Sequence, residues 1–259
     1  QVLRPAERDD SVLKLLFASL PESLLFSRSA GAVASLLRRL KRVREAPEGK
    51  PSAQIDAWGN YLTDGRTLEL LAAVANGAGR GVFSAMAGAL ASKGLSILSA
   101  ETSIVDGGVL LLRFTADDSR IRESTNAAEA NRRVQSLCAA VNSSVDRHEA
   151  PSFPQVWGAD RAVAARELSG QPDEVRIDAT LSDECAIIEV FSVDRVGLLY
   201  RLARALHEQG LVIRFAKIAT SLDQVVDVFY VTERDETKPT DQERLEGVRR
   251  RLMEELEAE

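Results

Sequence analysis

The sequence predicts an α+β protein made of two similar domains, each a small antiparallel sheet with two helices on one face. Two observations lead to this prediction. One part of the chain repeats another at a distance of 116 residues. In each copy the apolar patterns run in the order strand, helix, strand, strand, helix, as in a split β-α-β-β-α-β motif. A repeat of this length indicates a duplicated domain rather than a solenoid.

Composition and charge limit the class of protein. Hydrophobic residues make up 45% of the 259 residues and charged residues 28%, which is typical of a globular chain. No uncharged apolar run approaches the ~20 residues of a membrane-spanning helix, so no membrane partner is expected. The 33 basic and 39 acidic residues give a net charge of −6, which argues against nucleic acid as the main partner.

The cysteines and the N-terminal residues indicate the cellular compartment of the protein. Cys138 and Cys185 are too few for a disulfide framework and are expected to be free thiols in a reducing compartment. The apolar stretch 12–20 follows acidic residues, so no secretory signal is predicted. These features predict a cytoplasmic protein. A first residue of Gln1 in place of Met predicts a chain cut from a longer one.

Residues 1–48 are predicted to form a helical linker segment ahead of the repeat. Ser29 is a candidate N-cap for the second helix of this segment. The apolar residues after it recur at helical spacing, at Val33, Leu36, Leu37, Leu40 and Val43. We interpret the basic residues between them as a solvated helix face. Proline and glycine between positions 45 and 51 then break the helix.

The two copies are assigned to residues 52–150 and 173–259, with a linker rich in proline and glycine over 151–172. The residues that coincide include Gly81 and Gly197, Ala87 and Ala203, Leu90 and Leu206, Gly94 and Gly210, Ile97 and Ile213, and Ala100 and Ala216. Because glycine is the usual residue just beyond a helix, Gly94 and Gly210 mark the predicted ends of two equivalent helices.

The elements of each copy follow from the apolar periodicity. In the first copy, strands are predicted over 67–75, 95–105 and 109–116, and helices over 82–93 and near 124–141. In the second copy, strands are predicted over 186–193, 211–221 and 225–232, and helices over 198–209 and from Thr240 or Asp241 onward.

The last strand of the motif has no room in the second copy, because the sequence ends directly after the final predicted helix. A matching tripeptide lies just before the first strand of each copy, as Ile55-Asp56-Ala57 and as Ile177-Asp178-Ala179. We expect an antiparallel strand there to take the edge position, so that each copy is a permuted version of the motif without an open first strand.

The second copy resembles an ACT domain, a small regulatory ligand-binding module with a ferredoxin-like fold. The resemblance rests on the run DRVGLLY from Asp194 to Tyr200, followed by ARALHEQGLVIRFAKIAT and VVDVFYV, and covers almost all of 174–258. It is strongest to the paired C-terminal ACT domains of bacterial enzymes that uridylylate the PII nitrogen-signalling protein. Val196 stands where the family usually has proline. The loop of the first copy, Gly77 to Gly81, has lost the aspartate.

The chemistry of such enzymes is not visible in this sequence. The resemblance implies a nucleotidyltransferase domain and a hydrolase domain with histidine–aspartate metal ligands. The two histidines, His148 and His207, are not followed by aspartate and are interpreted as surface residues. Asp10 is interpreted as part of a solvated terminus and Asp118 as a strand-end turn. We therefore expect a regulatory region with no catalytic residue, metal or cofactor, whose partners are the catalytic domains of a parent protein.

The loop before the first helix of each copy is the predicted ligand site. The first-turn amides of a helix lack internal partners and lie at its positive end, which suits the carboxylate of an amino acid. The resemblance implies that an effector, glutamine in this family, binds between paired sheets. The candidates are Asp194, Arg195, Gly197, Leu198 and Leu199, with Phe215, Ala216, Lys217 and Ile218 opposite. Asp194 is expected either to bind the ligand's ammonium group or to cap the helix.

In the first copy the corresponding loop residues are Asn76, Arg80 and Gly81. Without the aspartate, this loop is expected to be a degenerate site or one that only pairs the two domains. The pairing itself is open: the two sheets can associate within one chain or between the chains of a homodimer.

Two other interpretations use the same residues. The chain can be an ACT interaction or dimerisation module that binds no small ligand. Alternatively, Gly77, Gly79 and Gly81 with Glu101 imitate the fingerprint of an NAD-dependent enzyme. The glycine spacing is GxGxG rather than GxGxxG, and no further strand–helix units follow, which argues against the NAD-dependent enzyme.

Overall fold

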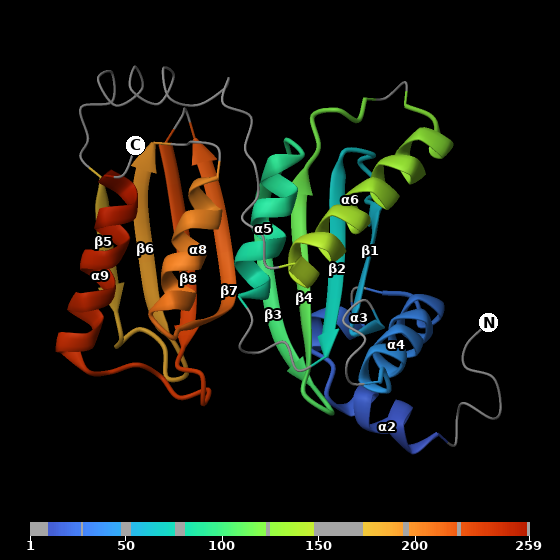
Figure 1. Cartoon of the computed structure of the whole chain (residues 1–259), viewed down its shortest axis with the longest axis horizontal. Coiled ribbons are helices and arrows are strands. Elements are labelled where there is room, and N and C mark those ends of the chain that lie inside the picture. Colours follow the sequence, from blue (N-terminus) through green and yellow to red (C-terminus); the bar gives the residue numbers. More distant parts are fainter. Residues whose placement is uncertain are drawn as a thin grey trace.

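The computed structural model in Figure 1 describes residues 10–26, 28–47, 53–75, 81–122, 125–147, 173–193, 197–221 and 224–257. Its first part contains α2 (Ser11–Ala18), α3 (Glu22–Phe26), α4 (Ala30–Arg44), β1 (Ile55–Tyr61), β2 (Thr67–Ala75), α5 (Val82–Ser92), β3 (Ser96–Val105), β4 (Val109–Asp117) and α6 (Ala127–Arg147). Its second part contains β5 (Glu174–Asp178), β6 (Ala186–Val193), α8 (Leu198–Glu208), β7 (Val212–Ser221), β8 (Gln224–Thr232) and α9 (Gln242–Glu257).

The described strands form one eight-stranded sheet in the order β1-β2-β4-β3-β7-β8-β6-β5, with every neighbouring pair antiparallel. Each copy contributes four strands in the same order, which confirms the α+β class and the duplication. The edge strand β1 contains the first matched tripeptide, and β5 ends within the second, at Asp178, so the permuted arrangement is also confirmed. The NAD-dependent alternative was wrong, because a dinucleotide-binding fold needs a mostly parallel sheet.

The two copies join within the chain along β3 and β7. Three antiparallel pairs form this seam, namely Ser99 with Lys217, Ala100 with Ala216, and Glu101 with Phe215. Helices α5 and α8 pack against each other across the same seam, as Figure 1 shows. Since β3 and β7 are the same strand of the repeat, the two halves meet as in a symmetric dimer. The sheet pairing that the sequence left open is intramolecular here.

The helix boundaries follow from glycine and capping residues. Helices α5 and α8 each begin at a glycine in the left-handed region, with φ of 62° at Gly81 and 82° at Gly197. They stop just before Gly94 and Gly210, whose φ values of 80° and 78° confirm the predicted ends. Asp241 caps α9, because its Oδ1 accepts a hydrogen bond of 2.7 Å from the amide of Arg244.

One hydrophobic core runs through both copies on the face of the sheet that carries α5, α6, α8 and α9. Phe114 of β4 and Phe229 of β8 occupy equivalent positions in it, and both are fully buried. Helices α5 and α8 contribute Leu90 and Leu206 to the same cluster. Burial of these side chains therefore stabilises the seam as well as each half.

Helices α2, α3 and α4 cover the opposite face of the sheet, over the first copy only. The apolar side of α4 packs on Leu71 of β2 and Leu111 of β4. Ser29 caps α4 as predicted, by accepting from the amide of Ala32. The described part of the segment predicted to be helical contains these three helices.

The polar residues of this segment correct two interpretations. Asp10 is an N-cap rather than a solvated terminus, since its Oδ1 accepts from the amides of Val12 and Leu13 and its carboxylate pairs with Lys41. The basic side of α4 is only partly solvated. Arg39 lies 2.9 Å from Asp56 of β1, so this basic side contacts the sheet.

Asp118, expected in a strand-end turn, is fully buried. Its carboxylate accepts hydrogen bonds from Arg133 of α6 at 2.9 Å and from the hydroxyl of Tyr61 at 2.8 Å. Burial alone would raise the pKa of Asp118, but these donors hold it below its usual value. This group ties β1, the end of β4 and α6 together.

A pocket between the two copies

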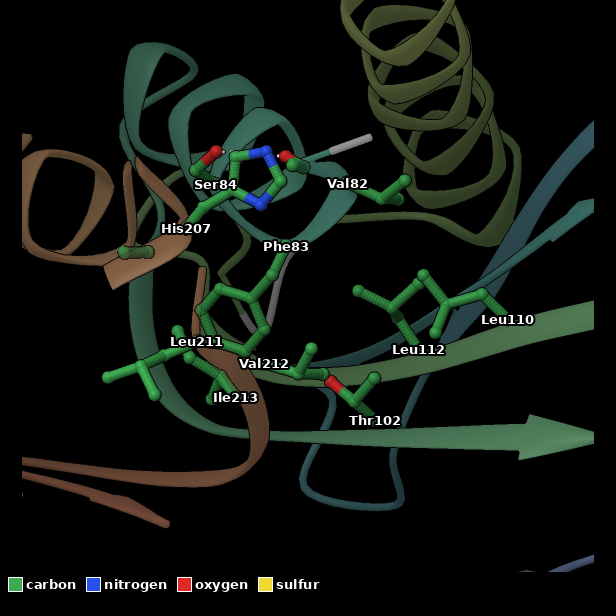
Figure 2. Close-up of a pocket in the computed structure, with 12 residues that line it drawn as sticks. Val82, Phe83, Ser84, Thr102, Leu110, Leu112, His207, Leu211, Val212 and Ile213 are labelled. Carbon is green, nitrogen blue, oxygen red and sulfur yellow. Dashed lines mark hydrogen bonds between the residues drawn. The ribbon is translucent and has the colours of Figure 1, made fainter. Parts of the chain in front are cut away.

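A pocket opens at the seam, between the start of α5 in the first copy and the second copy (Figure 2). About 420 Å³ of space free of protein atoms lies in and in front of it, open solvent included. The first copy contributes the first turn of α5, residues 81–84, together with Thr102, Leu110 and Leu112. The second copy contributes Ala203, His207 and residues 211–213. A small ligand bound here would contact both halves of the protein.

The N-terminus of α5 lines the pocket. Gly81 is the N-cap, and no side chain in the described part of the protein hydrogen-bonds to the first-turn amides. The hydroxyl of Ser84 donates instead to the carbonyl of Gly81, at 2.8 Å. The first-turn amides and the positive end of the helix dipole favour an anionic group at this place.

The wall of the pocket contains an orphan hydroxyl. Thr102 of β3 is only 7% exposed, and its Oγ1 has no hydrogen-bond partner in the described part of the chain. An unpartnered buried hydroxyl costs about 1–3 kcal/mol, so buried polar groups are normally paired. Around it the wall is apolar, with Leu112 and Ile213 both buried. The pocket thus places an unsatisfied, buried hydroxyl among apolar side chains.

His207 closes the pocket from the second copy. It was interpreted as a surface residue, but it is half-buried, and its ring lies over the first turn of α5 in Figure 2. A Cβ at Gly81 would lie 3.1 Å from Cδ2 of this ring. Burial lowers the pKa of His207, and the positive charge of Arg234 lowers it further, against the opposing effect of Glu208. The imidazole is therefore neutral near pH 7.

The structure separates the residues predicted for the site of the second copy. Asp194 and Arg195 lie outside the described residues, as do Asn76 and Arg80 of the first copy. Gly197 is the N-cap of α8, with Leu198 buried and Leu199 half-buried behind it.

The candidates on β7 lie beside the seam and on two faces of the sheet. Ala216 is fully buried on the helix-covered face, and Ile218 packs against the same core. Strand alternation places Phe215 and Lys217 on the other face, where the rings of Phe215 and Tyr230 are 5.6 Å apart. Only Ala216 and Ile218 therefore share a face with the start of α8.

The two loops differ in the chemistry that surrounds them. Thr102 corresponds in the repeat to Ile218, and His207 corresponds to Ala91. Leu112 corresponds to Asp227, because Leu112 and Asp227 each lie two residues before the equivalent phenylalanines of β4 and β8. Asp227 is 1% exposed. The start of α5 thus shares a pocket with a hydroxyl and an imidazole, whereas the second copy carries a buried carboxylate at the equivalent strand position.

In the part of the chain that the structure describes, no cluster of three or more His, Cys, Asp or Glu side chains is arranged to hold a metal ion. Both cysteines are free, and burial raises the pKa of the Cys138 thiol to about 11 and also raises that of Cys185. These thiols are protonated near pH 7 and correspondingly unreactive. None of the described helices is long and apolar enough to cross a membrane.

Comparison with known proteins gives two findings. Residues 174–259 match the family model described as the ACR9-like, ACT-like domain. The chain is also similar to bifunctional uridylyltransferase/uridylyl-removing enzymes. It is 32% identical to that of Azospirillum brasilense over 173 residues, which are 67% of this chain and 18% of the relative. The enzyme of Ruegeria pomeroyi is 34% identical over 153 residues, 59% and 16% of the two chains. The chain therefore spans less than a fifth of these relatives.

Proposed function

We propose that this chain, whose residues 174–259 are an ACT-like domain and which resembles part of the uridylyltransferase/uridylyl-removing enzymes, senses an amino acid on behalf of such an enzyme. The proposed effector is glutamine. The catalytic domains of the longer protein are the proposed partners, and the activity they carry out would respond to the occupancy of this region.

The observation that carries the proposal is the seam pocket. The ligand's carboxylate would accept hydrogen bonds from the first-turn amides of α5, next to Gly81. The apolar wall would pack against the aliphatic part of its side chain. The orphan hydroxyl of Thr102 would bond to the polar end, which a carboxamide can satisfy as donor or as acceptor.

The position of the pocket explains how ligand binding would change the arrangement of the two copies. Its lining comes from both copies, so an occupied pocket stabilises the arrangement in which α5 and α8 are close. A ligand shifts such an equilibrium only by the difference in its affinity for the two arrangements. A pocket at the seam provides that difference, because separation of the copies removes the contacts that one of them makes with the ligand.

A pairing module without a ligand is the second candidate. The continuous core and the β3–β7 pairing support it, because they hold the copies together with no effector present. That candidate gives the unpartnered hydroxyl of Thr102 no role.

A thermal-shift screen of the purified chain separates the two candidates. With glutamine at about 100 times its dissociation constant, the free energy of unfolding should rise by about 2.7 kcal/mol. For a protein of this size that corresponds to a rise in Tm of roughly 5–10 °C. Glutamate, asparagine, serine and glycine form the comparison panel. The absence of any shift at millimolar concentrations of all five would favour the module without a ligand.

A further inference from the structure

The imidazole of His207 comes from the second copy but lies against Gly81, at the start of α5 in the first copy. A Cβ built on Gly81 would meet its Cδ2 at 3.1 Å and its Nε2 at 3.4 Å. Figure 2 shows the ring beside Ser84, over the uncapped end of α5. Among the described residues, none forms a hydrogen bond with either ring nitrogen.

We propose that His207 is a ligand-binding residue of the seam pocket, where its protonated imidazole donates a hydrogen bond to the carboxylate held at the N-terminus of α5. This rests on the proposed function and assigns to one side chain the recognition of the ligand's charge. The buried, unpartnered hydroxyl of Thr102 in the same pocket independently points to a polar ligand.

The charges around His207 determine when it is protonated. On its own helix Glu208 favours the imidazolium, and beyond β8 Arg234 disfavours it. The lining that α5, β3, β4 and the start of β7 contribute contains no ionisable side chain. In the empty pocket burial and Arg234 therefore keep the ring neutral near pH 7, with a lowered pKa. A bound carboxylate supplies the missing negative charge and raises that pKa.

The sign of the resulting pH dependence follows from linkage. Because the pKa of His207 is higher in the complex than in the free protein, binding takes up a proton between these two pKa values. Affinity is lowest at a pH above both. It rises as the pH falls through the interval, by up to about tenfold per pH unit, and then levels off. The second loop lacks this behaviour, because Ala91 takes the place of His207 there.

Calorimetric titration of the full chain with L-glutamine between pH 5.5 and 8 tests the proposal. We expect weaker binding at higher pH, and a proton uptake that appears as a difference in heat between buffers of unlike ionisation enthalpy. His207→Gln keeps a hydrogen-bonding side chain but should bind with the same affinity at every pH. Arg234→Gln should move the pH dependence upward and Glu208→Gln downward, in accordance with their opposite effects on His207.

A second measurement, on the wild-type chain, tests the proposal if a variant does not fold. In the wild-type chain the imidazole C–H signals of its two histidines can be followed by NMR, with His148→Gln for assignment. Saturating L-glutamine should raise the pKa of His207, and L-glutaminol, which lacks the carboxylate, should leave it unchanged.

The outcomes distinguish the role of His207 from the proposed amino-acid sensing. Glutamine binding that is independent of pH, or equal in wild type and His207→Gln, overturns the role of His207 and leaves amino-acid sensing intact. An unchanged pKa of His207 in the glutamine complex has the same consequence. No binding of any amino acid overturns both.

Discussion

Asp118→Ala is expected to lower the free energy of unfolding by about 3–5 kcal/mol, the usual effect of breaking a buried ion pair from one side. Asp118 is fully buried, and Arg133, which is largely buried, would lose the carboxylate that neutralises it. The hydroxyl of Tyr61 would lose its acceptor as well. Urea denaturation followed by circular dichroism measures the change, with an unchanged m-value as evidence that the folded state is intact.

The neighbouring residue provides the matched control. Asp117 pairs with Arg66 at 2.6 Å, but the side chain of Arg66 is 60% exposed. Asp117→Ala should therefore change the free energy of unfolding by less than about 1 kcal/mol. Equal effects of the two substitutions would mean that burial of the Asp118 group does not stabilise the fold.

The stabilisation by Asp118 should also depend on pH. Its pKa is lowered in the folded protein, so the ionised form stabilises the fold above the unfolded-state pKa of about 3.9. As the pH falls below that value, the difference between wild type and Asp118→Ala should become smaller.

Gly81→Asn is expected to weaken glutamine binding at least tenfold and to remove the thermal shift. Residue 81 has a φ of 62°, which asparagine tolerates better than other residues with a Cβ. The new side chain would begin 3.1 Å from the His207 ring, at the mouth of the pocket, and would displace either the ring or the ligand. The dissociation constant from calorimetry measures the effect.

The control for Gly81→Asn is Gly94→Asn. Gly94 has a similar φ of 80°, but a Cβ there meets nothing within 4 Å, so the backbone strain is matched and the pocket is untouched. Gly94→Asn should bind glutamine as the wild type does. Gly197→Asn tests the second loop, and loss of binding in that variant alone would move the effector site from the seam pocket to the start of α8.

Much of the fold was predictable because its signals are local. The left-handed glycines at the ends of α5 and α8 and the capping by Ser29 and Asp241 act within a few residues of the chain. The sequence even indicates that the first copy's part of the sheet is covered by helices on both faces. Strand β2 reads as an almost continuous apolar run, whereas β6 alternates between buried and half-buried residues. That run indicates a strand covered by helices on both sides.

The site was less predictable, because its residues come from both copies. Gly81 was identified as a loop residue, but its neighbour His207 looked like a surface residue of α8. A helical residue is exposed or covered according to what packs on it, and here that is the first turn of α5 from the other copy. Thr102 carried no signal, since a threonine in a strand is ordinary until its hydroxyl is found without a partner.

The duplicated α+β architecture, the permuted edge strands and the glycine loops were determined by the amino-acid sequence alone, because turn chemistry and apolar periodicity operate over short stretches of chain. Only the tertiary structure decided that β3 pairs with β7, that Asp118 is buried, and that Thr102 and His207 enclose one pocket. These contacts join residues far apart in the chain, and their geometry depends on how the two sheets meet and which side chains are buried when they do.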